Sequence, residues 1–417
     1  MITLDKINRT IFFIILLTPV ISIFFYEFSD LALIAIVRSA VIAYGIAFLF
    51  MKENIQISRI STFILLFSFY IFIWSFFTGE FDNKGLVKTI LYNEYLATFF
   101  ILVIIYNTKL NDKFFNNAIS IIKILIVITA IGSVIQVFNS DFLQVPTNDD
   151  AESLISKSIY EMRRGSIYRF EGPNSLGLSF IPLLAVLIGY MLRKKDKNYI
   201  YFLMIGGLAA LLTNTRYVMI GFIILSFQII YYKKVKLLGF FRYAFIVLIF
   251  SFLAIEVLNL FGYNMTIWFE ERLFQEQAIT ETTRYKAIGT FAQFFPEAPV
   301  FGTGGITQSI RSASRAVGSS HIHVGYLSHL IYYGIVGCFF LFGFWWLLLR
   351  RFYKNAKFTN YWGSFFAMLT FLFAFATMSE SSFFFSGLIF MVIFDKYYIE
   401  KTKLAFYKHK LQTKTSS

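Results

Sequence analysis

The sequence predicts an all-α, polytopic integral membrane protein with about 12 transmembrane helices and a large extracytoplasmic loop between helices 9 and 10. Of the 417 residues, 57% are hydrophobic and only 15% are charged, and the mean hydropathy is +0.65. A water-soluble protein of this size needs about a quarter of its residues charged. The excess apolar surface must therefore face lipid.

A succession of apolar runs supports this fold class. Each run is long enough, or nearly so, to cross a hydrocarbon core of about 30 Å as a helix. The first is a retained span, because no small-residue cleavage site follows it. The pairs 199–232 and 360–395 are short enough to form tight helical hairpins. We expect residues 1–417 to form a single membrane-embedded domain with spans at 10–26, 31–51, 60–78, 88–106, 118–138, 175–192, 199–213, 217–232, 238–261, 322–349, 360–378 and 382–395.

The distribution of basic residues predicts that both termini are cytoplasmic. In that orientation the inner segments, including the basic tail 396–417, contain 24 of the 38 Lys and Arg residues, and the outer segments contain 12. This asymmetry follows the positive-inside rule. The net charge of +14 is therefore explained by topology, and we expect no nucleic-acid partner.

Composition also argues against several kinds of active site. A single cysteine, Cys338, excludes a disulfide framework or a thiolate metal cluster. Four histidines leave little room for a multi-histidine metal site. We expect no metal and no cofactor, and the nucleotide-binding pattern GxxxxGK[ST] is absent.

Two outer loops are substantial, 139–174 and 262–321, and loops of this length are more often functional than connective. The first ends in MRRGSIYRFEGPNSLG, with Arg163, Arg164 and Arg169 just above the membrane and Asn174 as the expected N-cap of the next helix. These arginines either contact lipid headgroups or form an anion site with the helix N-terminus. Arg216, at the turn between two later spans, either snorkels to the interface or takes part in such a site.

The second loop contains a helical segment that begins near Arg284 and ends at Pro296 and Pro299. Its apolar face consists of Ala287, Phe291 and Phe294–Phe295. Gly302, Gly304 and Gly305 predict a flexible bend that would let the loop fold over a ligand. The basic residues Arg311 and Arg315 follow.

His323 then begins the tenth span, where Gly334 and Gly337 permit close helix packing. A histidine at a helix end is often structural, but it is also the best candidate for a base near neutral pH.

Ionisable residues inside spans suggest function by default. Arg38 and Glu94 lie at similar depth, so they either pair with each other or line a groove for a lipid carrier. Lys123 is expected to snorkel to the inner face, and Glu256 is placed to orient an arginine.

In this order, these features resemble the O-antigen ligase and polysaccharide polymerase superfamily of bacterial envelopes. The resemblance covers residues 163–340. It departs from the family pattern at Ala287, where members often have tryptophan, and at Val324, where asparagine is common. The matching residues are Arg169 with Gly172-Pro173-Asn174, Arg216, Arg284, Pro299 with Gly302 and Gly304, and His323 with Leu327, Gly334 and Gly337.

The resemblance implies a bacterial inner-membrane enzyme that transfers glycan at the outer leaflet. The reaction would be an inverting, metal-independent glycosyl transfer from a polyprenyl-diphosphate-linked donor. Arg216 and Arg284 would neutralise the diphosphate, while His323 would act either as the base or as a hydrogen-bond donor to the diphosphate. A chain-length regulator and a flippase of the same pathway are further partners that it implies. The substrate-binding residues would be Arg169, Asn174, Arg38, Arg311 and Arg315.

Several functions fit these features. The leading hypothesis is a polymerase for O-antigen, capsule or exopolysaccharide that moves the growing chain onto a lipid-linked repeat unit. A ligase that moves finished glycan, such as lipopolysaccharide O-antigen, to a lipid A core or another acceptor uses the same donor chemistry. A flippase for lipid-linked oligosaccharide would fit the number of spans, but such transporters usually have two related halves, and the sequence shows none. A purely structural membrane protein is the remaining alternative.

Overall fold

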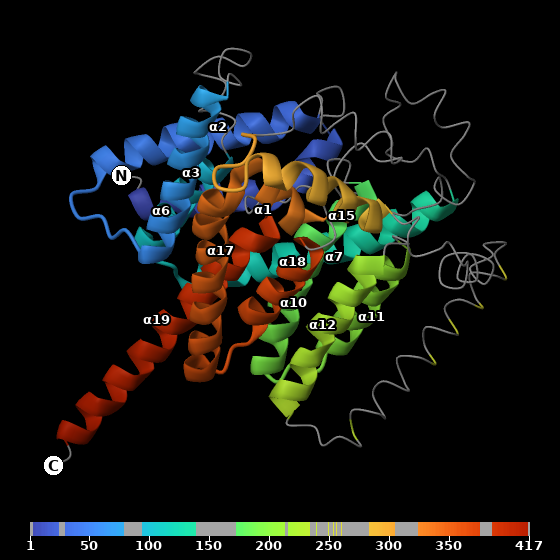
Figure 1. Ribbon diagram of the computed structural model, residues 1–417. Helices are drawn as coiled ribbons and strands as arrows, with labels where there is room; N and C mark the ends of the chain where they lie inside the picture. The colour runs from blue at the N-terminus through green and yellow to red at the C-terminus, as the bar shows by residue number, and fades with distance from the viewer. Residues whose placement is uncertain are drawn as a thin grey trace.

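The structure is a computed structural model that describes residues 3–24, 30–78, 94–138, 172–212, 216–233, 283–304, 324–375 and 386–415, with isolated residues between 239 and 260. These segments are helical with short connections, in agreement with the all-α prediction. The helices, labelled as in Figure 1, are α1 Leu4–Phe24, α2 Asp30–Met51, α3 Arg59–Phe77, α6 Glu94–Asn107, α7 Asp112–Phe138, α10 Gly172–Arg193, α11 Tyr199–Leu212, α12 Arg216–Lys233, α15 Thr283–Phe294, the 3-10 turn η3 Phe295–Glu297, α17 Gly325–Thr359, α18 Gly363–Phe375 and α19 Ser386–Thr415.

The described helices agree with the predicted membrane spans. Every predicted run except 238–261, which lies almost entirely outside the described residues, overlaps one of them. Several of the described helices are apolar but shorter than a full membrane span, so the total of about twelve spans stays a prediction. Within the part of the chain that the structure describes, the helices long and apolar enough to cross a membrane are Arg59–Phe77, Asp112–Ile135 and Gly325–Thr359.

Two helices continue well past their predicted spans. α17 remains helical through the expected inner segment 350–359, and α19 continues through most of the tail 396–417. Neither extension contains proline or glycine, so nothing in the sequence stops the helix when its side chains become polar. Figure 1 shows the C-terminal half of α19 extending away from the other helices.

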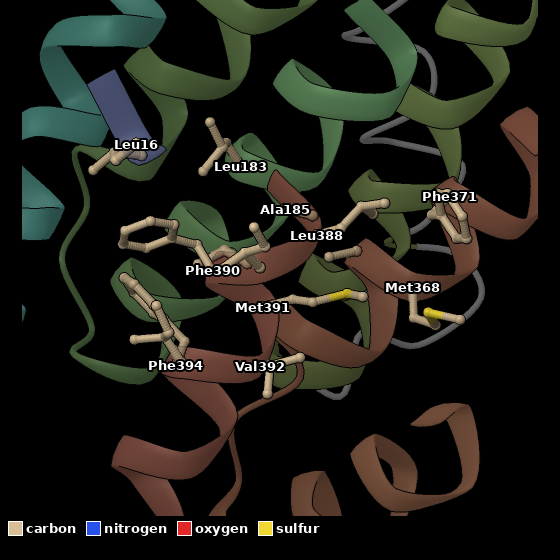
Figure 2. Packing of buried hydrophobic residues seen from close by; sticks show 14 of the residues in the cluster. Leu16, Leu183, Ala185, Met368, Phe371, Leu388, Phe390, Met391, Val392 and Phe394 are labelled. Carbon is tan, nitrogen blue, oxygen red and sulfur yellow. The ribbon is translucent and has the colours of Figure 1, made fainter. Parts of the chain in front are cut away.

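The centre of the bundle is formed by α10 and the first half of α19. Residues 183–188 of α10 and 388–394 of α19 are almost completely buried, because α10 is surrounded by α7, α11, α12, α18 and α19. Figure 2 shows side chains of α10, α18 and α19 meeting in this core. A helix that is apolar on every side belongs at the centre of a bundle.

A close approach between α10 and α18 tightens this core. A Cβ atom added to Gly189 would lie 2.5 Å from the Cα atom of Gly363. Small residues at a contact allow two helix backbones to come together in a membrane.

At one end of the bundle, cationic side chains lie close to the ends of helices. The Lys396 ammonium donates to the carbonyl oxygens of Ile105 at 2.8 Å and Tyr106 at 3.0 Å, at the C-terminus of α6. Cations favour this negative end of a helix dipole. Nearby, Arg351 pairs with Asp395 at 3.4 Å. The structure therefore brings together segments that the charge pattern assigns to the cytoplasmic side, while their orientation in a membrane stays a prediction.

Candidate functional site

The other end of α17 carries the helix that contains Arg284. α15 packs against the first half of α17, and α15 ends at Phe294, followed by one 3-10 turn that contains Pro296. The apolar face predicted for this helix and its end before the prolines are therefore confirmed. The shared cluster contains Ala287, Phe291, Phe294, Phe295, Val324, Leu327, Ile331, Tyr332 and Tyr333.

The two departures from the family pattern have visible positions in this contact. Ala287 is 3% exposed, so a small side chain is packed where family members often carry a large one. Val324 is the N-cap residue of α17 and gives no side-chain hydrogen bond to the helix. Asparagine at this position would supply such a cap.

α17 is broken at Gly334. This residue has φ 61° and ψ −170°, a backbone region occupied almost only by glycine. The regular hydrogen bonds between successive turns are interrupted there. The helix therefore consists of a short first part, residues 325–333, which we call the outer half because it follows the predicted outer loop, and a longer second half.

The segment 299–304 pairs with the backbone on both sides of this break. The amides of Thr303 and Gly304 each donate at 2.9 Å, to the carbonyl oxygens of Ile331 and Tyr332 respectively. In the other direction, the amide of Ile335 donates to the carbonyl of Pro299 at 2.9 Å, and that of Val336 to Val300 at 3.1 Å. Residues 299–304 and 331–336 together form what we call the backbone clamp.

The glycines of the motif make the clamp possible. Gly302 and Gly304 have φ 72° and 82°, and a Cβ atom on Gly302 would lie 2.5 Å from the Gly334 amide nitrogen. The predicted bend is therefore present at these two residues, where packing and hydrogen bonds hold it, while its flexibility stays a prediction. Gly305 lies outside the described residues.

α3 supports the clamp from one side. The Tyr70 hydroxyl lies 2.5 Å from the Phe301 carbonyl oxygen and 2.8 Å from that of Tyr333. The indole N–H of Trp74 donates to the carbonyl of Gly302 at 3.1 Å. A Cβ atom on Gly337 would lie 2.5 Å from the Tyr70 ring, which confirms the close packing predicted for Gly337.

A buried histidine connects α17 to α6. The His329 Nδ1 atom lies 2.9 Å from the Gly325 carbonyl oxygen. Because a carbonyl only accepts, Nδ1 carries the hydrogen, and the Tyr95 hydroxyl at 3.4 Å faces the acceptor Nε2. Among the described residues, His, Cys, Asp and Glu form no group of three or more suited to a metal.

Next to Tyr95, Glu94 forms an ion pair with Arg38 at 2.8 Å. The Arg38 side chain is 18% exposed and the Glu94 side chain is 20% exposed. The ion pair between Arg38 and Glu94, one of the two alternatives suggested by the sequence, is therefore present. It engages the Arg38 guanidinium, which was predicted to bind substrate. Lys123, by contrast, lies over the Phe202 ring with its Nζ atom 5.7 Å from the ring centre.

The structure places some of the predicted site residues by their backbone. Arg216 is the first residue of α12 and Arg284 the second of α15. The prediction that Asn174 is an N-cap is wrong, because α10 begins two residues earlier at Gly172, with Pro173 in its first turn. The residues Arg163, Arg164, Arg169, Arg311, Arg315 and His323 lie outside the described residues.

Contacts bring the starts of α12 and α17 to the same end of α18. The hydroxyl of Tyr326, in the first turn of α17, donates to the Leu372 carbonyl of α18 at 3.0 Å. Two residues earlier on α18, Thr370 lies beside Gly221 of α12, which follows Arg216 by five residues. The start of α12, which carries Arg216, and the start of α17, which follows His323 in the chain, therefore lie at the same end of the bundle.

The sequence motifs do not include the contributing residues of α3, nor Tyr95 or His329. The sequence contains one signal for α3, where Tyr70, Trp74 and Thr78 are spaced i, i+4 and i+8 in a largely apolar span. That spacing places hydrogen-bonding side chains on one face of a helix. For Tyr95 and His329, no pattern in the sequence pairs them.

Comparison with protein families agrees with these observations. Residues 199–342 match the family model described as O-antigen ligase. Residues 199–342 therefore resemble an O-antigen ligase domain, and this matched part of the chain is called the O-antigen ligase domain below. No curated protein matches the chain.

The O-antigen ligase domain contains the positions that form this end of the bundle. It covers α11, α12, α15 and the first half of α17, and thus includes Arg216, Arg284 and His323. Arg169 and Asn174 precede it. The match supports an integral membrane protein of the O-antigen ligase or polymerase type, for which lipid-linked glycans are the implied substrates.

Proposed function

We propose that this protein is a polysaccharide polymerase that acts on polyprenyl-diphosphate-linked glycans at the outer leaflet. The observation that carries the proposal is the packing of α15, which holds Arg284, against Val324 and Leu327 of α17. Val324 directly follows His323 in the chain. Of the three residues that the proposed chemistry requires, Arg284 thus lies on a helix that packs against the residues directly following His323 in the chain, and all three fall within the matched residues.

The reaction breaks the bond between the anomeric carbon of the donor glycan and its phosphate oxygen. A hydroxyl of the acceptor sugar attacks that carbon from the opposite face, which inverts its configuration, and the lipid diphosphate departs with the bonding electrons. Arg216 and Arg284 stabilise the growing negative charge, since guanidinium groups bind phosphate in a bidentate way. His323 accepts the proton of the hydroxyl, a step worth about 10²–10⁴-fold.

The remaining predicted residues contribute to binding. Arg169, Arg311 and Arg315 would contact the diphosphate or the glycan, and Asn174 lies in the first turn of α10, where helix amides favour an anion. Arg38 would act in binding only together with Glu94, its partner.

A ligase is the second candidate, favoured by the description of the matching family as O-antigen ligase. It would use the same donor and the same residues, but its acceptor would be a lipid A core or another final acceptor. The two functions therefore differ in product rather than in the chemistry of the site.

Single substitutions test the catalytic assignment. We expect Arg216→Ala, Arg284→Ala and His323→Ala each to abolish glycan transfer, because each removes a charge-stabilising or proton-accepting group. Membrane abundance of each variant shows whether the protein is still inserted. Arg350→Ala, an exposed arginine at the opposite end of α17, is the matched control and should retain activity. Normal glycan synthesis in the triple variant would overturn the assignment.

The size of glycans in cells that lack the gene separates the two candidates. Single lipid-linked repeat units without long chains would identify a polymerase. Full-length polymer that remains on its lipid carrier would instead identify a ligase. Unchanged glycans in both pools would contradict the proposed function altogether.

A further inference from the structure

The backbone clamp depends on a helix outside the matched O-antigen ligase domain. Segments 299–304 and 331–336, which form the clamp, lie within residues 199–342, whereas α3 lies far before them. Yet Tyr70 and Trp74 of α3 together contact the carbonyls of Phe301, Gly302 and Tyr333.

Tyr70 occupies the junction between the two clamped segments. Its hydroxyl lies within hydrogen-bonding distance of one carbonyl on each segment, at 2.5 Å from Phe301 and 2.8 Å from Tyr333. A hydroxyl has a single hydrogen to donate, so the two carbonyls share it. This shared contact ties segment 299–304 to the outer half of α17.

The clamp controls how α15 is held. α15 leads through η3 directly into Pro299, where the clamp begins, and it also packs against α17 through the apolar cluster described above. Apolar contacts alone are non-directional, whereas the hydrogen bonds of the clamp fix distance and register. The position of Arg284 relative to the start of α17 therefore depends on the clamp.

We propose that Tyr70 is a positioning residue that, through the backbone clamp, sets the placement of α15 and its Arg284 against the outer half of α17. This inference rests on the proposed function for its effect on catalysis. Trp74 acts in the same way through Gly302. Neither side chain is assigned any contact with the substrate.

Distance measurements between spin labels test the structural part without any substrate. With Cys338 replaced by Ala, labels at Ile288 of α15 and Phe339 of α17, both exposed, report the distance between the two helices in lipid nanodiscs. We expect Tyr70→Phe to broaden the distance distribution. Tyr361→Phe is the matched control, because it removes a buried hydroxyl that donates to the Val186 carbonyl of α10, away from the clamp, and it should leave the distribution unchanged.

Kinetics test the catalytic part on the same variants. We expect Tyr70→Phe to lower the kcat of glycan transfer by about 10- to 100-fold, since small misplacements of catalytic groups have effects of this size. The KM for the lipid-linked donor and the thermal unfolding temperature should stay close to those of Tyr361→Phe. If Tyr70→Phe does not fold, Trp74→Phe, which removes the N–H donor to Gly302, takes its place.

The outcomes are separable. An unchanged distance distribution, or a broadened one with full kcat, would overturn the positioning role of Tyr70. Equal effects of Tyr70→Phe and Tyr361→Phe would also overturn it, because hydroxyl loss would then only loosen the bundle. A broadened distribution in a protein whose unmodified form transfers no glycan would leave the clamp intact and contradict the proposed function instead.

Discussion

At Gly334 the polypeptide takes backbone angles that other residues tolerate poorly, and two segments depend on it. The break exposes carbonyls of the outer half of α17 and amides of the second half, and segment 299–304 satisfies both. Unpaired backbone groups would be costly at this depth, because lipid offers them no partner. Glycine at this position therefore permits both the break in α17 and the backbone pairing of segment 299–304.

We expect Gly334→Ala to disrupt the clamp and to reduce glycan transfer strongly. A side chain there costs about 1–3 kcal/mol in backbone strain, and its Cβ atom would also collide with the Val300 carbonyl and lie 2.5 Å from the Gly302 amide nitrogen. Thermal unfolding of the purified protein and a transfer assay measure the two effects.

Gly289→Ala provides the control for that substitution. Gly289 lies within α15, and a Cβ atom there would meet nothing within 4 Å. Because alanine favours a helix over glycine by about 1 kcal/mol, this variant should be as stable as the parent or more so. Equal loss of stability in both variants would contradict the special role of Gly334.

The sequence predicts Gly334 and Gly337 as packing residues, and only Gly337 follows that expectation. Spacing in a helix says which residues share a face, and this is enough to place Gly337 beside another helix. The break at Gly334 accompanies backbone pairing with segment 299–304, which lies well before Gly334 in the chain. Such a long-range backbone contact leaves no periodic signal.

Among the elements, the second half of α17 and the first half of α19 are joined by a partly buried charge pair. The Asp395 side chain is 4% exposed and that of Arg351 27% exposed. The Asn355 amide also donates to Asp395, at 2.8 Å. This network connects the helix that carries the clamp to the helix at the centre of the bundle.

We expect Arg351→Ala to destabilise the protein, although Arg351 lies far from the proposed chemistry. Removing one partner of a fully buried ion pair costs about 3–5 kcal/mol, and the loss here should be smaller because Asn355 still binds Asp395. Thermal unfolding and the amount of protein in membranes measure this effect. Arg350→Ala should change neither, and an equally stable Arg351→Ala variant would show that the pair contributes little.

For the whole molecule, the charge pattern and the contacts describe the same arrangement. Segments assigned to the inner side by their lysines and arginines meet at one end, where Lys396 caps α6 and Arg9 donates to the Lys109 carbonyl. The start of α12, with Arg216, and the start of α17, which follows His323 in the chain, lie at the other end. Hydropathy and charge are sufficient to predict this level of organisation, since both act along entire segments.

Labelling of introduced cysteines tests the orientation. In a Cys338→Ala background, Asn148→Cys in the first outer loop should react with an impermeant maleimide in intact cells. Lys197→Cys, in the connection between α10 and α11, should react only after the membrane is permeabilised. The reverse pattern would invert the topology and place the proposed site on the cytoplasmic side.

The candidate site was less predictable than the topology. The sequence suggested the helix of Arg284, its apolar face and its end before the prolines, because these depend on local periodicity and chain stiffness. The support from Tyr70 and Trp74 depends on how α3 packs against α17, which no local pattern encodes. The arginines and His323 of the outer loops stay predictions.

The burial of α19 has a consequence for biosynthesis. Residues 388–394 fill the centre of the bundle beside α10 and α6, yet they are translated after every helix that they touch. The earlier helices must enter the membrane and remain loosely associated until this last segment arrives. Compaction of the bundle around α10 is therefore a late event, and a ribosome that stalls before Ser386 would leave a chain without its centre.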